Sequence, residues 1–240
     1  MTNTETRSPF RGRGFIAAAV VVGIIVLAAI VVILTSVIGG GSDEPTSAPT
    51  DVTPSSTSPT ASADDESVCG LEGFETTNTL DQAPSNDWAL VGTVAAPEDP
   101  EGAGPGENTD GIRTCYAHTA EGALFMTVNF AAMGTDASLQ GRLTPLIAPG
   151  TGRDAAENAP TGSASNLRAQ VAGFKIASYS TEEATVDLAL NYSSGELVSL
   201  PIKLVWAEGD WKIQMTDQGT LPLSPSPLEN LGGYIPWSGA

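Results

Sequence analysis

The sequence is poor in the side chains on which most enzymes depend. Its 240 residues contain a single histidine, His118, and two cysteines, Cys69 and Cys115. A nucleophilic triad needs a histidine beside a serine or cysteine, and no GxSxG motif accompanies His118. A zinc site needs three or four histidine or cysteine ligands, more than this chain supplies once its cysteines pair. We therefore expect no enzyme, no metal centre and no cofactor.

Positive charge is also scarce. Ten Lys and Arg residues face 28 Asp and Glu residues, which gives a formal net charge of -18. Three of the ten, Arg7, Arg11 and Arg13, precede a long apolar run, so 7 bases face 27 acids after it. Such an excess of carboxylates repels phosphate backbones, which argues against nucleic-acid binding by the folded part. Divalent cations or basic protein surfaces are better partners, although the acidity can equally serve only to keep an exported domain soluble.

The apolar run covers residues 15–38, FIAAAVVVGIIVLAAIVVILTSVI, and contains no charge. As a helix its 24 residues span roughly 36 Å, more than a hydrocarbon core of about 30 Å. A cleaved signal peptide is the alternative, but its apolar region is usually about 7 to 15 residues long and ends at a small-x-small site. We therefore predict an uncleaved transmembrane helix at 15–38 that contacts the lipid bilayer.

Charge on either side of the run sets its orientation. The three arginines lie before it, and Asp43 and Glu44 lie behind it. By the positive-inside rule, residues 1–14 form a cytoplasmic tail and everything after residue 38 is outside the cell. The predicted localisation is a single-pass protein of the cell membrane with an extracellular C-terminal domain.

Residues 39–66 contain 11 Ser or Thr and four Pro, and almost no large apolar side chains. A core cannot form from this composition, so we expect a disordered linker, either plain or O-glycosylated. Apolar residues return after it, and residues 67–240 are long enough for one extracytoplasmic domain.

The first part of this domain mixes strand and helix patterns. Residues 88–94 alternate like one short strand, and residues 97–106 are rich in turn formers. Thr119 can cap a helix that continues to Met133, with Glu121 in its first turn, although LFMTVNF within it also alternates like a strand. Residues 138–170 favour two helical pieces, one through Leu139, Leu143 and Leu146 and one that opens at Asp154.

The second part is strand-like. Runs at 171–179, 184–192, 197–207 and 211–215 are separated by short polar turns, which predicts an antiparallel meander. Pro201 interrupts the third run and should mark a bulge or an edge. The fold class is therefore α+β, with helices packed on a bent antiparallel sheet. The last twenty residues are rich in Pro and Gly and either fray or dock through Tyr234 and Trp237.

Cys69 and Cys115 both fall outside the cell, where a lone pair of cysteines usually forms a disulfide. Closing a loop of this length is worth about 4 kcal/mol in the chain-entropy model. The alternative is a reactive Cys115 thiol activated by His118, which leaves Cys69 without a role. We expect His118 to be structural, with its ring beside the disulfide and bonded to nearby backbone. Asp187 faces solvent or, alternatively, the concave side of the sheet.

Two further motifs resemble ligand sites only in part. Acidic runs such as 98–101 lack the EF-hand spacing with its glycine and terminal glutamate. The glycine-rich stretch 102–106 lacks the lysine of a phosphate-binding loop. We interpret both as turns.

Several short motifs occur together: Cys69-Gly-Leu, Trp88-Ala-Leu-Val-Gly, Gly104-Pro-Gly and the run from Cys115 to Leu124. This set resembles a family of actinobacterial membrane-anchored proteins of unknown function, over roughly residues 67–220. The resemblance implies a link to integrative and conjugative elements, and it carries no catalytic residues. The strands from ATVDLALNY to LVWAEGDWKIQM are similar to those of a cystatin-like, or nuclear transport factor 2-like, cone. That fold behind one membrane helix is similar to scaffold subunits of type IV secretion channels.

Together these features lead us to expect a non-enzymatic envelope protein that binds or assembles other envelope proteins, as an accessory of conjugative DNA transfer. A small extracytoplasmic enzyme with His118 or Asp187 as base, or a solute or cell-wall sensor, is the alternative. A perturbed carboxylate or histidine in a pocket would favour the enzyme.

Overall fold

A computed structural model describes residues 66–159 and 168–239. The predicted tail at 1–14, the transmembrane helix at 15–38 and all but the last residue of the linker at 39–66 lie outside these residues. Within the described ranges, every helix is too short or too polar to cross a membrane.

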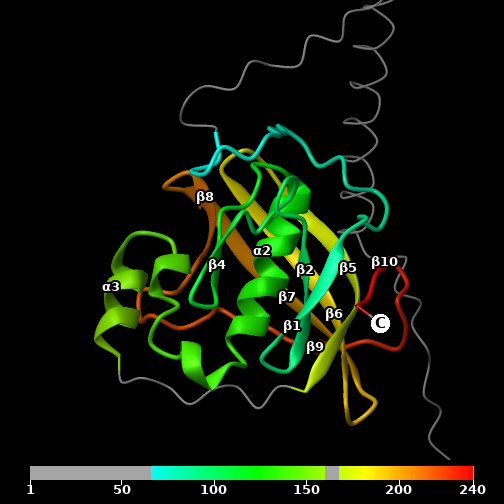
Figure 1. The fold of residues 1–240 in the computed structure, drawn as a ribbon. Coiled ribbons are helices and arrows are strands. Elements are labelled where there is room, and N and C mark those ends of the chain that lie inside the picture. The colour runs from blue at the N-terminus through cyan, green and yellow to red at the C-terminus, as the bar shows by residue number, and fades with distance from the viewer. Residues whose placement is uncertain (1–65, 160–167, 240) are drawn as a thin grey trace, which may run out of the picture. The chain divides into compact units, whose positions relative to one another are not determined.

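The described chain is an α+β domain, as the sequence predicts, with most of its regular structure in strands (Figure 1). The elements in chain order are β1 (Asp87–Val91), β2 (Val94–Glu98), β3 (Glu107–Thr109), β4 (Ile112–Thr114), α2 (Ala120–Met133), η2 (Ala137–Leu139), η3 (Thr144–Leu146), α3 (Thr151–Asn158), β5 (Ala169–Tyr179), β6 (Glu183–Tyr192), β7 (Leu197–Ala207), β8 (Asp210–Ile213), β9 (Ser226–Pro227) and β10 (Ile235–Pro236).

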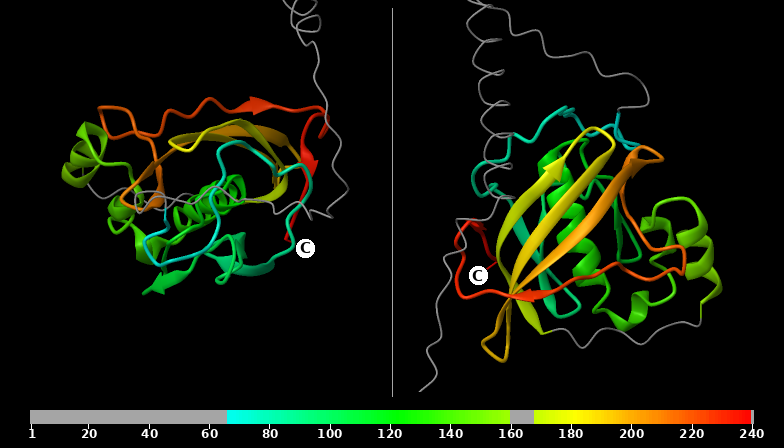
Figure 2. Two further views of the ribbon diagram at one scale, coloured as in Figure 1. Left: turned by 90° about the horizontal axis from the view of Figure 1, so that it is seen from above. Right: turned by 180° about the vertical axis from the view of Figure 1, so that it is seen from behind.

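The predicted meander is confirmed. Strands β5 to β8 pair antiparallel in chain order, β10 is added beside β5, and β9 pairs with β7. Side chains alternate across β6, so Ala184, Val186, Leu188 and Leu190 join the core under α2. The sheet bends around that helix (Figure 2), and register shifts at two points of β5 accompany the bend.

Helix α2 begins where the sequence predicts. The Thr119 hydroxyl accepts the Gly122 N–H at 3.0 Å, and the Glu75 carboxylate accepts the Ala120 N–H at 2.9 Å. These bonds satisfy donors that a helix start leaves unpaired. Twelve of its 14 residues are buried, so it is apolar on nearly all sides. That explains why its sequence also resembles a strand.

Two predictions of local structure are wrong, and a third holds in part. Residues 88–94 do not form one strand, because Gly92 adopts a positive φ of 57° and turns the chain into the hairpin β1–β2. The stretch 97–106 is turn and loop from Asp99 onward, as predicted, but its first two residues belong to β2. Around Leu139, Leu143 and Leu146 two 3₁₀ turns replace a helix, because Gly141 between them has φ 79°.

Helix α3 starts at Thr151, three residues before the predicted Asp154, and has no fully buried residue. The prediction that several helices pack on the sheet is therefore corrected: among the helices of residues 66–159 and 168–239, α2 alone is a core helix, and α3 lies at the side (Figure 1).

Pro201 was predicted to mark a bulge or an edge, but β7 lies between β6 and β8 and the proline marks a local gap in its pairing. Pairing of β7 with β6 runs through Pro201 without a register shift. On the other side of β7, pairing with β9 involves residues 198–199 and pairing with β8 involves residues 204–207, so the proline sits between them. A residue without an N–H fits that interval.

The C-terminal stretch docks. It runs from the end of β8 across the sheet face opposite α2 to the edge of β5 (Figure 2), and Trp237 is only 6% exposed.

Candidate functional site

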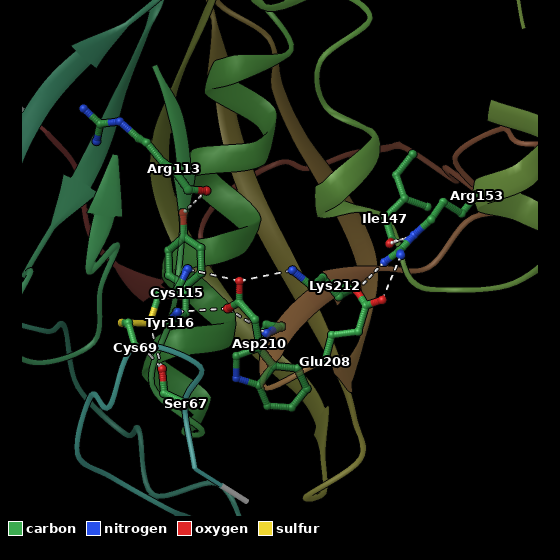
Figure 3. Close-up of polar contacts among 11 residues, drawn as sticks. Ser67, Cys69, Arg113, Cys115, Tyr116, Ile147, Arg153, Glu208, Asp210 and Lys212 are labelled. Carbon is green, nitrogen blue, oxygen red and sulfur yellow. Dashed lines mark hydrogen bonds and ion pairs between the residues drawn. A yellow bond between two sulfur atoms is a disulfide. The ribbon is translucent and has the colours of Figure 1, made fainter. Parts of the chain in front are cut away.

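A polar network surrounds Asp210, the first residue of β8 (Figure 3). The β7–β8 turn places it there. Glu208 and Gly209 both have positive φ, 58° and 72°, which is the backbone of a two-residue type I′ hairpin loop. Because this turn places Asp210 at the start of β8, its carboxylate lies against the segment between β4 and α2.

The Asp210 carboxylate is 1% exposed and accepts four hydrogen bonds. Oδ1 accepts the N–H groups of Tyr116 and Trp211, each at 2.9 Å. Oδ2 accepts the Cys115 N–H at 3.0 Å and the Lys212 ammonium at 3.3 Å. Burial raises the pKa of Asp210, while the charge of Lys212 and the backbone donors act in the opposite direction. The Asp210 carboxylate is therefore a desolvated hydrogen-bond acceptor that connects the end of β4 to the start of β8.

The predicted disulfide between Cys69 and Cys115 is present, with the two Cα atoms 6.0 Å apart. Cys115 has a positive φ of 65°, a conformation that non-glycine residues seldom adopt. Its N–H is held by Asp210 and its sulfur lies 2.8 Å from the Ser67 hydroxyl. The Val68 N–H donates to the Gly209 carbonyl at 2.7 Å, so the start of the domain is fastened to the β7–β8 turn.

An ion pair beside this turn connects it to α3. The Arg153 guanidinium donates to both carboxylate oxygens of Glu208, at 3.0 and 2.7 Å, and through Nε to the Ile147 carbonyl at 2.7 Å. The hydrogen bond from Arg153 lowers the pKa of Glu208. Paired hydrogen bonds of this kind fix the direction of both side chains.

A second buried cation is Arg113 on β4, which lies in the core near the Asp210 network. It pairs with Glu98 at 2.6 Å and donates to the Asn129 side chain at 3.2 Å. Tyr116 is completely buried nearby, and burial first, with the Asp210 charge second, raises its pKa well above the ordinary value. Neither side chain is open to a substrate.

The side chain of His118 packs among aromatic rings. Its ring stacks on Trp206 with centroids 3.7 Å apart and meets Trp211 and Phe74 edge-on at 5.6 and 5.1 Å. Nε2 lies 2.6 Å from the Thr181 carbonyl, which agrees with the predicted bond to backbone. The three ring contacts given above are all with aromatic side chains. It is 1% exposed.

Asp187 does not face solvent, the preferred expectation, and it does not face the concave side either. Because Val186 and Leu188 on either side of it face the core, Asp187 lies on the sheet face opposite α2, where it contacts Tyr234 of the C-terminal stretch and is 6% exposed. It accepts hydrogen bonds from the hydroxyls of Ser199 at 2.7 Å and Tyr234 at 2.8 Å, and Lys175 lies 3.3 Å away. The structure thus separates Asp187 from His118 and the disulfide.

A surface groove of about 480 Å³ lies beside the start of α2. Glu75, Asp81 and Glu121 are the acidic residues of its lining. Burial, followed by the charges of Asp99 and Glu75, raises the pKa of the half-buried Glu121. His118 and Asp187 are absent from the lining of this groove and from that of two further cavities of about 410 and 280 Å³.

The polar side chains described above hydrogen-bond to the backbone and to neighbouring side chains of the domain itself. Among residues 66–159 and 168–239, no group of three or more His, Cys, Asp or Glu side chains could hold a metal ion. The sequence reasoning missed Asp210 as an anchor. Its signals were the Glu208-Gly209 pair, typical of a tight hairpin, and a charged residue next to the apolar Trp211 at the start of a strand.

Comparison with known proteins gives one informative result. No curated protein and no solved structure matches the chain. A family model described as a domain of unknown function (DUF8175) matches residues 48–236, which is most of the chain. The chain therefore belongs to the DUF8175 family.

Proposed function

We propose that this chain is a non-enzymatic, membrane-anchored envelope protein whose domain at 67–240 binds or assembles other envelope proteins. One observation carries the proposal. His118, the one histidine of the sequence, is enclosed by Trp206, Trp211 and Phe74 and bonded to backbone. A buried ring of this kind has no route to a substrate, so it serves packing.

The remaining parts of the proposal come from the sequence. The apolar run at 15–38 supports an anchor in the bilayer with the amino terminus in the cytoplasm. The excess of acids after that run supports a partner other than nucleic acid.

The setting of the proposal is conjugative DNA transfer. It is supported by the resemblance to actinobacterial proteins linked to integrative and conjugative elements. A curved antiparallel sheet around one core helix is also what a cystatin-like cone, the fold similar to type IV secretion scaffolds, would have. One fold serves many functions, so the test of this setting is genetic.

The test compares two variants in a cell that carries the conjugative element. Deletion of residues 67–240 with the anchor retained should abolish transfer, because the binding domain is removed. His118→Gln, in a protein that accumulates normally, should leave transfer intact. Loss of transfer in a stable His118→Gln protein would contradict the proposal and point to chemistry at this residue.

One observation favours the alternative of a pocket enzyme or sensor. Glu121 lines the groove and has a raised pKa, as a general acid or a ligand-binding carboxyl often has. Glu121→Gln removes the titrating proton and keeps the side-chain shape. The assembly role expects transfer in this variant at the level of the parent protein, with Glu101→Gln on the neighbouring exposed turn as the matched control.

A further inference from the structure

The C-terminal strap, residues 216–239, is attached to the rest of the domain at several points. Near its start, the Thr151 hydroxyl of α3 donates to Asp217 at 2.7 Å, and Leu221 packs against the core. Strand β9 contributes two residue pairs with β7, and β10 contributes two with β5. Between the turn at 216–220 and β9, residues 221–225 are largely exposed, and their backbone hydrogen bond, from Leu223 N–H to the Leu221 carbonyl, is local. The strap is thus a separate piece laid on the sheet (Figure 2).

Trp237 inserts into an aromatic socket made by the body of the domain. Its ring centroid lies 4.6 Å from that of Trp88 on β1, 5.5 Å from Phe174 on β5 and 5.8 Å from Phe125 on α2. Its indole N–H donates to the Asn86 side chain at 3.1 Å. The socket therefore consists of residues outside the strap, and it fits an extended segment that carries a tryptophan.

A latch holds the strap upstream of the tryptophan. The Tyr234 hydroxyl donates to Asp187, and the Lys175 ammonium lies 4.8 Å from the centre of the Tyr234 ring. Asp187, Ser199 and Lys175 lie on the sheet, so the latch also joins strap to body. Without a strap, the apolar surface of the socket would be exposed to water, and the Asp187 carboxylate would lose the Tyr234 hydroxyl as a donor. Occupancy of the socket and latch by a strap is therefore favourable.

The connection to the body is long enough to reach a neighbouring molecule. The fourteen residues 221–234 include β9, so they extend only when the two β7–β9 residue pairs and the hydrogen bond from the Leu228 N–H to the Leu197 carbonyl break. At about 3.3 Å per residue they then span roughly 46 Å. Pro222 and Pro225 favour an extended path ahead of β9. These are the properties of a hinge that can open as a unit.

We propose that the C-terminal strap exchanges between two copies of this chain, so that Trp237 of each copy fills the socket of the other. The exchanged contacts are identical to those within one copy, so exchange needs no new complementarity and its cost is mainly that of association. Confinement of both copies to one membrane would reduce that cost. The inference gives the proposed assembly role a specific partner, a second copy, and rests on that role only for its biological use.

The charge of the chain sets a condition on the exchange. At a net charge of -18, two copies repel each other, and salt screens this repulsion. Exchange should therefore increase with ionic strength. Association through opposite charges would decrease instead.

The experiment uses the full chain in membranes. Two differently tagged copies are produced together, and one carries a photo-crosslinking amino acid at exposed Ser238, next to the tryptophan. Crosslinks to the other tag are expected, they should increase with salt, and Trp237→Ala in the photo-labelled copy should reduce them to background. The control position is Thr220, which is exposed and outside the socket; its signal measures mere proximity.

A second measurement keeps the test decisive if Trp237→Ala accumulates poorly. A copy that ends after Pro225 has the aromatic socket but lacks Trp237. Its accumulation should therefore rise when a full-length donor copy is present, and it should remain low with a Trp237→Ala donor of equal abundance. Crosslinks confined to single copies at all salt concentrations would overturn the exchange. Because this readout involves no DNA transfer, exchange can fail while the proposed function stands, and the reverse.

Discussion

At the residue scale, Asp210 concentrates more bonds than any other carboxylate described above. Its two oxygens serve three backbone N–H groups and one buried ammonium. Donors that converge in this way need an acceptor on both oxygens. The role of the side chain therefore depends on its charge and on the symmetry of the carboxylate.

Asp210→Asn tests this role. The amide would replace one acceptor oxygen with an NH₂ donor, so one pair of the four donors would face another donor. Lys212, which is only 7% exposed, would also lose its charged partner. Loss of one member of a buried ion pair typically costs about 3 to 5 kcal/mol. We expect a loss of that order in chemical unfolding of the full chain, with Asp81→Asn on the exposed groove rim as the control. An unfolding free energy equal to that of the parent would contradict the assignment.

Residues such as Asp187 and Asp210 show where sequence reasoning stops. The capping role of Thr119 was predictable because its acceptor and donor lie three residues apart. Asp187 instead meets Tyr234, 47 residues away, and Asp210 meets the Cys115 backbone across 95 residues. Local periodicity contains no information on such partners, so the burial of both carboxylates was missed.

At the element scale, the β7–β8 hairpin depends on its turn and on α3. Glu208 lies in the left-handed region, and its carboxylate pairs with Arg153 of α3. The hydrogen bond that lowers the pKa of Glu208 favours the ionised form in the folded state. A carboxyl with a lowered folded pKa stabilises the fold above its ordinary pKa, and this contribution is lost as pH falls through the lowered value.

Glu208→Gln should therefore destabilise the domain at pH 7 and progressively less below the ordinary carboxyl pKa of 4.5. Half of the Glu208 side chain is exposed, so we expect an effect of no more than about 1 kcal/mol. Thermal or chemical unfolding of both proteins from pH 7 to pH 3 measures the difference. The exposed Glu229→Gln variant should follow the parent at every pH, and a Glu208→Gln effect that persists undiminished at pH 3 would rule out ionisation as its cause.

The hairpins also show how far local sequence patterns predict structure. The four long strand runs were predictable from alternation, and their order follows from short turns between them. The hairpin β3–β4 was not predicted, although Asp110-Gly111 is a typical two-residue turn signal and both residues have positive φ. Its strands have three residues each, too few for alternation to emerge.

At the scale of the whole molecule, one covalent bond and one strap close the domain from its two ends. The disulfide fixes the start of the domain to the segment before α2, and the strap fixes the end of the chain to β5. Strands β5 to β8, which lie between these fasteners in the sequence, form the sheet.

Replacement of both cysteines, Cys69→Ser with Cys115→Ser, should lower the unfolding free energy by about 2 to 4 kcal/mol. The physical reason is the larger entropy of an unfolded chain in which 46 residues of separation are no longer closed into a loop. Chemical unfolding with and without reductant provides the measurement. Reductant should shift the parent protein to the variant's midpoint and leave the variant unchanged; an unshifted parent with fully alkylated thiols would contradict the account.

The position of the disulfide also determines how the domain responds to mechanical force. A pull on the chain ahead of Glu66 passes from Cys69 through the sulfur–sulfur bond to Cys115, and bypasses residues 70–114. The hairpins β1–β2 and β3–β4 are therefore shielded from tension that enters at this end. Reduction would expose them to it and release, at about 3.3 Å per residue, roughly 150 Å of slack between the pulling point and α2. While the bond is intact, residues 70–114 therefore add nothing to the extension of the domain under load.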